Sequence, residues 1–336
     1  MTVGIVAEHT MKPSRRKFLY LACSAVAIPA VARTAWAQSY PARSIRMVVP
    51  VSAGGANDVT ARMIAQKLSE AWGQQVYVDN IPGGGEIVGT GQVAKAQANG
   101  YTVLFAAGAH TLNPSLHARL PYDTLKDFAP ITLVASGPHA LTVHPSVPAS
   151  NVKELVALVK ANPGKYSFAS SGANTQPRLV GELFKLKFGL DLVHVPFSGG
   201  GPAMTSTIGG HTPIAFTSLS NASGNIRDGK LRALALTSAK RLREFPDVPT
   251  MTEVGLPELV TGSMQGIVAP AGTPKPIIDL WRSEVARIVA LPEIRERLIS
   301  FGLEPVVNTP EEFDAWIKTE IAKWGKAMQD AKIPKI

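Results

Sequence analysis

The chain has 336 residues, of which 45% are hydrophobic and 18% charged, which excludes a disordered or fibrous protein and allows a large core. Basic residues outnumber acidic ones by nine, but residues 1–37 hold five basic residues and one acidic residue, so the remaining body carries a surplus of only five. Because this surplus forms no basic run, we expect no nucleic-acid partner. The single cysteine, Cys23, excludes a disulfide framework and a thiolate zinc site, and we predict no cofactor.

Residues 1–37 have the pattern of an export signal. The basic pair Arg15-Arg16 precedes an apolar run, residues 18–32, that is too short and too rich in alanine to span a bilayer comfortably. Ala35-Trp36-Ala37 then provides a cleavage site of the A-x-A type. The paired arginines resemble a twin-arginine signal, with an ordinary secretory signal as the alternative. We therefore predict a soluble protein that is cleaved near Ala37 and works in the periplasm.

The body after residue 37 alternates short β-branched runs with helical patterns, which is typical of a parallel sheet. The first run ends in Ser52-Ala53-Gly54-Gly55, and a helix follows, with Asn57 or Asp58 as its predicted N-cap and Trp72 near its end. The predicted strands are residues 44–51, 76–79, 101–107, 166–170, 192–196, 213–218 and 231–237.

Two sequences predict helix starts with a capping box. Asn151 is followed three residues later by Glu154, and Thr309-Pro310-Glu311-Glu312 combines a cap, a proline in the first turn and a box-closing glutamate. Apolar residues at helical spacing then form a stripe on the last helix, which we interpret as a core-packing face rather than a membrane or partner surface. The stripe consists of Phe313, Ile317, Ile321, Trp324 and Met328.

Three glycine-rich turns are candidates for a binding site, because each follows a predicted strand and precedes a helix. They are residues 50–58 (PVSAGGAND), 170–175 (SSGANT) and 195–203 (VPFSGGGPA). A helix start presents free backbone N–H groups and the positive end of the helix dipole, and glycines let a ligand approach the main chain closely. One such turn alone is explained by chain geometry, but three together predict the binding of an anion.

Other functional signatures are absent from the sequence. It contains no phosphate-binding P-loop, no dinucleotide fingerprint and no G-x-S-x-G nucleophile motif, and Gly83-Gly84-Gly85 continues at the wrong spacing for a nucleotide site. The six histidines after residue 37 occur singly, without the spacing of a metal site. These observations favour a binding protein over an enzyme.

Several longer motifs carry a resemblance to a known family. In order, they include YPARSIRMVVPVSAGGANDVTAR from Tyr40, VDNIPGGGEIVGT from Val78, LPYDTLKDFAPITLVAS from Leu120, HVPFSGGGPAM from His194 and FPDVPTMTEVGLPEL from Phe245. Across essentially the whole body, the chain resembles the Bug family, the extracytoplasmic solute-binding proteins associated with tripartite tricarboxylate transporters.

The resemblance implies an α/β fold of the type II periplasmic binding proteins, with two α/β lobes and a ligand cleft between them. Lobe 1 would comprise residues 38–136 plus 262–336, and lobe 2 residues 137–261. In this family the three turns hold a ligand carboxylate through backbone amides, hydroxyls and water. The matching candidate ligand-binding residues are Ser52, Ala53, Gly54, Gly55, Asp58, His110, Ser170, Ser171, Gly172, Asn174, Thr175, Arg178, Ser198, Gly199 and Thr217.

Three of these positions depart from the family pattern. Asn174 replaces a glycine and Arg178 replaces a histidine, so an additional cation could pair with a second carboxylate if Arg178 points inward. Thr217 replaces an acidic residue, which makes ligands with an ammonium group less expected. Asp58 either borders the anion or caps its helix.

We therefore predict a monomeric, non-enzymatic receptor for a small organic carboxylate, either a dicarboxylate or tricarboxylate or an aromatic acid, that closes by hinge motion. Its expected partners are the membrane permease subunits of a tripartite tricarboxylate transporter, or a sensor. One alternative is an exported α/β enzyme acting on a carboxylate, suggested by His110 and His194 near the expected cleft. A sensor adaptor without a transport role is the other.

Overall fold

The computed structural model of the chain describes residues 1, 2, 4 and 40–336, and the predicted signal and its cleavage site therefore fall almost entirely outside the described residues. The strands are β1 (Ile45–Val49), β2 (Val76–Asn80), β3 (Thr102–Ala106), β4 (Phe128–Val143), β5 (Ser167–Ser170), β6 (Val193–Pro196), β7 (Ile214–Ser218), β8 (Arg232–Leu236), β9 (Gly262–Pro270) and β10 (Glu304–Pro305). The helices are α2 (Ala56–Trp72), α3 (Ile87–Ala94), α4 (Ala109–Leu116), α5 (Val152–Lys160), α6 (Gln176–Phe188), α7 (Gly200–Ile208), α8 (Leu219–Arg227), the short 3-10 helix η1 (Pro257–Leu259), α9 (Lys275–Val289), α10 (Pro292–Ser300) and α11 (Pro310–Asp330).

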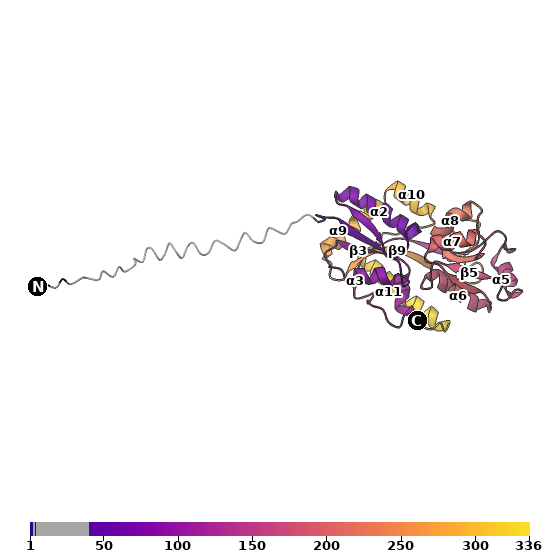
Figure 1. Cartoon of the computed structure of the whole chain (residues 1–336). Helices are drawn as coiled ribbons and strands as arrows, with labels where there is room; N and C mark the ends of the chain where they lie inside the picture. Colours follow the sequence, from indigo (N-terminus) through magenta and orange to yellow (C-terminus); the bar gives the residue numbers. More distant parts are fainter. Residues whose placement is uncertain (3, 5–39) are drawn as a thin grey trace. The chain divides into compact units, whose positions relative to one another are not determined.

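Within residues 40–336, two sets of parallel strands lie at opposite ends of one hydrogen-bonded path, in the order β2-β1-β3-β9-β4-β7-β5-β6. Strands β1, β2 and β3 are parallel to one another, as are β5, β6 and β7. Helices α2, α3 and α9 gather around the first set and α5 to α8 around the second (Figure 1). The chain thus has two α/β lobes, as the sequence predicts, and parallel strands point their carboxyl ends at the cleft.

Strands β4 and β9 connect the two sets. The first part of β4 pairs antiparallel with β9, from Phe128 to Pro138, while its last residues, His139 to Val143, pair with β7 and β8. Most of the 16 residues of β4 are buried. Neither β4 nor β9 is among the strands predicted from the sequence. A nearly continuous apolar run interrupted by prolines lacks the alternation of apolar and polar residues that identifies a half-buried strand.

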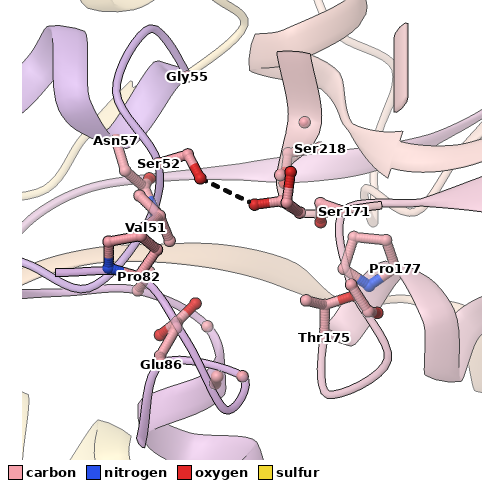
Figure 2. Close-up of a pocket in the computed structure, with 18 of the residues that line it drawn as sticks. Val51, Ser52, Gly55, Asn57, Pro82, Glu86, Ser171, Thr175, Pro177 and Ser218 are labelled. Carbon is pink, nitrogen blue, oxygen red and sulfur yellow. Dashed lines mark hydrogen bonds between the residues drawn. The ribbon is translucent and has the colours of Figure 1, made fainter. Parts of the chain in front are cut away.

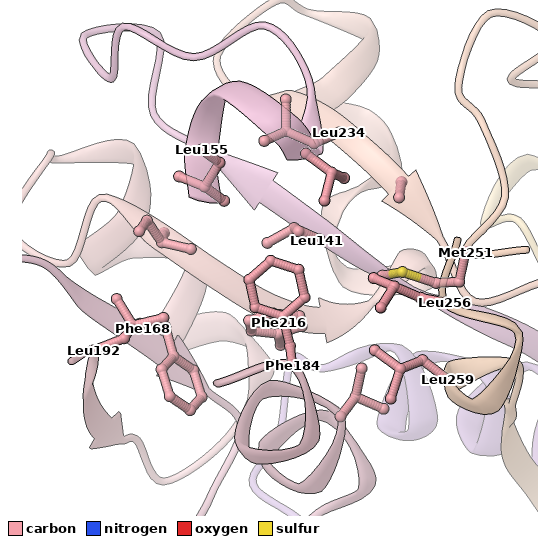
Figure 3. Packing of buried hydrophobic residues seen from close by; sticks show 14 of the residues in the cluster. Leu141, Leu155, Phe168, Phe184, Leu192, Phe216, Leu234, Met251, Leu256 and Leu259 are labelled. Atoms are coloured by element: carbon pink, nitrogen blue, oxygen red, sulfur yellow. The ribbon is translucent and has the colours of Figure 1, made fainter. Parts of the chain in front are cut away.

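Each lobe has its own apolar core, and α11 reaches both. One cluster centres on Phe168, Phe184 and Phe216 (Figure 3), and a second includes Val48, Leu104 and other residues of the β1–β3 region. On α11, Phe313 and Ile317 pack in the second cluster, whereas Trp324 and Met328 pack in the first. The predicted stripe is therefore a core-packing face, and one helix ties the two cores together.

The strand bounds and most helix caps agree with the predictions from the sequence. Every predicted strand is confirmed to within two residues, and Asn151 and Thr309 cap α5 and α11 as expected. The predicted cap of α2 is wrong: the helix begins at Ala56 with Gly55 as its N-cap, so neither Asn57 nor Asp58 has that role. Asp58 instead lies in the first helical turn, where its carboxylate accepts a hydrogen bond from the backbone N–H of Gly54 at 2.9 Å.

Candidate functional site

A cavity of about 610 Å³ opens between the lobes (Figure 2). We call residues 50–57, 82–86 and 107–109 the first wall, and residues 171–177, 197–202 and 218–221 the second wall. His139 of β4 and Ser263 and Met264 of β9 complete the lining. The first wall contains most of the turn predicted at residues 50–58, and the second contains most of the other two predicted turns. The structure therefore brings all three turns to one cavity.

Six helices begin at this cavity, three on each wall. Their N-cap residues all line it, whereas no lysine or arginine is among the lining residues of the described chain. Because a helix start carries N–H donors without an intrahelical partner and about half a positive charge, six helix starts around one cavity favour an anion there. The N-cap residues are Gly55 of α2, Glu86 of α3, Gly108 of α4, Thr175 of α6, Gly199 of α7 and Ser218 of α8.

The turn before α2 is held by a carboxylate behind the wall. Gly54 has φ +85°, a left-handed conformation that glycine adopts without strain. Asp58, which is 3% exposed, accepts from the Gly54 N–H and pairs with Arg62 at 3.0 Å. Burial alone would raise the pKa of Asp58, but hydrogen bonds from Arg62, Gly54 and Asn80 outweigh it and lower the pKa. Asp58 therefore stays ionised and shapes the turn, so that Gly55 faces the cavity.

The turn before α6 is fixed by its own hydroxyls. The Thr175 side chain caps the helix by accepting from the N–H of Arg178, and its Oγ1 also donates to the carbonyl of Gly172 at 2.8 Å. Ser170 Oγ is 2.7 Å from His194 Nε2, beneath the loop. Burial lowers the pKa of His194 to about 4, so this ring is neutral at physiological pH. These contacts hold Ser171 to Thr175 against the cavity.

The sequence-predicted residues divide into two groups. The structure brings nine of them together as lining residues: Ser52, Ala53, Gly55, Ser171, Gly172, Asn174, Thr175, Ser198 and Gly199. The other six are not among the lining residues: Gly54, Asp58, His110, Ser170, Arg178 and Thr217.

Burial or a hydrogen bond to the main chain keeps four of these side chains away from the cavity. His110 and Thr217 are buried, 1% and 0% exposed, and the His110 ring packs edge-to-face on Phe128 with centroids 5.0 Å apart. The Arg178 guanidinium donates to the carbonyl of Ala173 at 3.1 Å, so the inward orientation considered from the sequence is not adopted. Ser170 is likewise fully buried.

The walls touch each other through polar contacts at several points. Ser52 Oγ donates to the Ser198 carbonyl at 3.0 Å, the dashed line in Figure 2. The Ala56 N–H donates to Asn221 Oδ1 at 3.2 Å, and Asn174 Nδ2 donates to the Gly84 carbonyl at 3.4 Å. Each of these bonds joins residues from opposite walls, so they link the two walls across the cavity.

Sequence reasoning misses several lining residues, above all Glu86, Asn221 and His139. Glu86 follows the glycine run 83–85, whose spacing excludes a nucleotide site. That run was nevertheless the available signal that this loop lines a cavity. Asn221 lies in the first turn of α8, where no glycine-rich motif marks it. His139 lies in β4, a strand that is not predicted. Burial lowers the pKa of His139 to about 4, so this lining residue is neutral.

Glu86 is the acidic residue among the lining residues of the described chain. Its side chain is 8% exposed, and its Oε2 atom has no hydrogen-bond partner. Burial raises the pKa of Glu86 to about 8, although a hydrogen bond from the backbone N–H of Ala109 acts in the opposite direction. The cavity thus contains a carboxyl group that holds a proton at neutral pH.

Among the described residues, no group of three or more histidine, cysteine, aspartate or glutamate side chains is arranged to hold a metal ion. No helix in the same part of the chain has the length and apolar composition needed to cross a bilayer.

Comparison with known proteins gives consistent similarities. A family profile described as the tripartite tricarboxylate transporter family receptor matches residues 60–333. Protein BugT of Bordetella pertussis is 35% identical over 314 residues, which cover 93% of this chain and 95% of BugT. A solved structure of R. palustris Rpa4515 with adipate is 31% identical with a TM-score of 0.85, covering 88% of this chain and all of that one. MatC from Rhodopseudomonas palustris with bound malate is 29% identical with a TM-score of 0.81, covering 86% and 99%.

Proposed function

Because the chain belongs to the family of tripartite tricarboxylate transporter receptors, we propose that it captures a small organic carboxylate between its two lobes and delivers it to a transporter. The observation that carries this proposal is the convergence of six helix starts on a cavity lined by no lysine or arginine within the described residues. Main-chain donors from opposite walls neutralise the ligand charge, so the closed form is favoured when an anion is bound.

The hydrogen bonds that such a site offers are sufficient for micromolar binding of a carboxylate. A hydrogen bond to a charged group contributes about 1.5–3 kcal/mol, and micromolar affinity requires about 8 kcal/mol. A few N–H and hydroxyl donors around one carboxylate therefore suffice. The adipate bound by Rpa4515 and the malate bound by MatC support a carboxylate ligand and provide the first two probes for this chain.

The remaining parts of the proposal concern how the receptor works. Residues 38–136 plus 262–336 form one lobe and residues 137–261 the other, and the lobes close by hinge motion about the β4 and β9 connections. Residues 1–37 are the export signal, of the twin-arginine type, and the cleaved protein acts as a periplasmic monomer. Its partners are the membrane permease subunits of the transporter, and it performs no catalysis.

A ligand screen tests the function directly. The purified protein is heated in the presence of adipate, malate, citrate, benzoate and hexanoate, with hexanamide as the uncharged control for hexanoate. A ligand that binds only the folded state must raise the melting temperature. At a concentration of one hundred times its Kd it adds about 2.7 kcal/mol to the free energy of unfolding, which raises the melting temperature by a few degrees. We expect at least one acid to give this shift and the amide to give none.

Two results would count against the proposal. Equal shifts with hexanoate and hexanamide would mean that the helix starts do not recognise charge. Chromatography after incubation with each acid measures whether a product forms. Product in excess of one equivalent of protein would identify an enzyme instead.

A further inference from the structure

The Glu86 carboxyl is an unexpected group in a cavity built to attract anions. It lies on the first wall, and Figure 2 draws its carboxyl group on that side of the cavity, below Pro82. More than nine-tenths of the side chain is buried, and Oε2 has no partner. The backbone at Glu86 is also left-handed, with φ +74°, which costs a non-glycine residue about 1 kcal/mol or more. A costly group with unused hydrogen-bonding capacity therefore borders the cavity.

The surroundings of Glu86 determine its charge. Burial is the main cause of its raised pKa, and the Ala109 N–H opposes it only in part. Burial lowers the pKa of both His110 and His139 to about 4, so these rings are neutral between pH 6 and 9. Tyr122 lies close to Glu86, since its pKa is raised by burial and also by the charge of Glu86. The titratable and charged groups on neighbouring elements also include Asp58, Arg62, His110, His117 and His139.

An anion in the same cavity pushes this balance further. A ligand carboxylate held by the helix starts is a like charge near Glu86, and like charges raise the pKa of a carboxyl group. With ligand bound, Glu86 is therefore a neutral acid. A neutral carboxyl group has an O–H donor that a carboxylate lacks, and a hydrogen bond from such a donor to a charged acceptor is one of the stronger kinds in proteins.

We propose that Glu86 determines specificity by donating a hydrogen bond, as a neutral acid, to an acceptor at the second end of the ligand, so that ligand and proton are taken up together. This inference rests on the proposed carboxylate-binding function. A dicarboxylate offers the required acceptor at its far end, whereas a monocarboxylate of equal length does not. The receptor therefore selects diacids without a lysine or arginine among the lining residues of the described chain.

Calorimetric titration of the full chain with adipate and with hexanoate at pH 6, 7, 8 and 9 tests this inference. Adipate affinity should fall roughly tenfold from pH 7 to pH 9, because Glu86 loses its proton above about pH 8. Titrations in buffers of different ionisation enthalpy should show uptake of about half a proton per adipate at pH 8. Hexanoate affinity should change by less than about threefold over the same range.

Two variants separate donation from packing. Glu86→Gln keeps a donor but has no titration, so adipate should still bind and its pH dependence should disappear. Glu86→Ala removes the donor, so adipate should weaken by roughly ten- to a hundredfold and hexanoate by less than about threefold. A folded pKa above the unfolded value means that Glu86 destabilises the fold as pH rises from about 4.5 to about 8. Glu86→Gln should therefore gain melting temperature over wild type across that interval.

The outcomes separate the role of Glu86 from the proposed carboxylate-binding function. Adipate binding that is independent of pH in the wild type, proton release instead of uptake, or equal losses for both acids in Glu86→Ala would overturn the role of Glu86 and leave the carboxylate receptor intact. If the wild type binds none of the acids in the screen, the proposed function fails and this inference fails with it.

Discussion

The two walls of the cavity are alike in their main chains and unlike in their side chains. Each contributes three helix starts, so each presents the same kind of backbone donor to a ligand. The first wall adds mostly glycine, alanine and proline, with the Ser52 hydroxyl and the Glu86 carboxyl among its polar groups. The second wall adds hydroxyls at Ser171, Thr175 and Ser218 and an amide at Asn221. We infer that charge is recognised equally by both walls, whereas selectivity depends on which side chains each wall offers.

The close approach of the two walls requires that the glycine-rich first wall be free of side chains where the second wall contacts it. A Cβ atom added at Gly85 would lie 2.3 Å from Asn174 Cβ on the opposite wall, and Gly85 has φ +64°. Gly85→Ala should therefore keep the two walls apart and give the largest effect, a loss of adipate affinity of about 1–3 kcal/mol, or roughly 5- to 150-fold. Isothermal titration measures the loss, and small-angle scattering should show a radius of gyration that no longer falls with ligand.

Gly201 on the second wall provides the matched control. It lines the cavity, but a Cβ atom there would meet no atom within 4 Å, and its φ is not positive. Gly201→Ala should bind adipate within about twofold of wild type. If both alanine variants lose affinity to the same extent, the clash between walls is not the cause.

The second wall supplies a side chain that satisfies a backbone donor of the first. Asn221 Oδ1 accepts from the N–H of Ala56 in the first turn of α2. Asn221→Ala removes this acceptor, and the expected loss is about 1 kcal/mol, or roughly fivefold in adipate affinity, because a neutral hydrogen bond contributes that much. Titration of Ser220→Ala serves as control, since Ser220 lines the same wall and has no hydrogen bond across the cavity among the described contacts. A variant Asn221→Ala that binds as tightly as wild type would show that the walls are not coupled here.

The sequence predicts the parts of this molecule that depend on local chemistry. Strand runs, the caps at Asn151 and Thr309 and the glycine turns follow from residues close together in the chain, and the structure has them at the expected positions. The β4 strand is different, because its partners β9 and β7 lie far away in sequence and its apolar run has no period. Long-range pairing of this kind leaves no local pattern.

The same distinction applies to the site. Glycine-rich turns reveal which loops approach a ligand, and they identify most of the residues from Ser52 to Gly55 and from Ser171 to Thr175. They do not reveal which side chains reach across the cavity. The Asn221 contact arises only where the two walls meet, and the groups at the buried Glu86 carboxyl, Ala109 and Tyr122, lie more than twenty residues away, so spacing along the chain carries no signal for either.

Arg178 gives the smallest expected effect and the sharpest test of where selectivity lies. From the sequence, this arginine was a candidate partner for a second carboxylate, but its guanidinium donates to the Ala173 carbonyl and Arg178 is not a lining residue. Arg178→Gln should therefore weaken adipate and hexanoate by the same small factor, about threefold or less, through loosening of the Ser171–Thr175 loop. Titration of both acids measures this ratio. A loss confined to adipate and larger than about tenfold would mean that the guanidinium turns toward the ligand and that selectivity for diacids comes from the second wall rather than from Glu86.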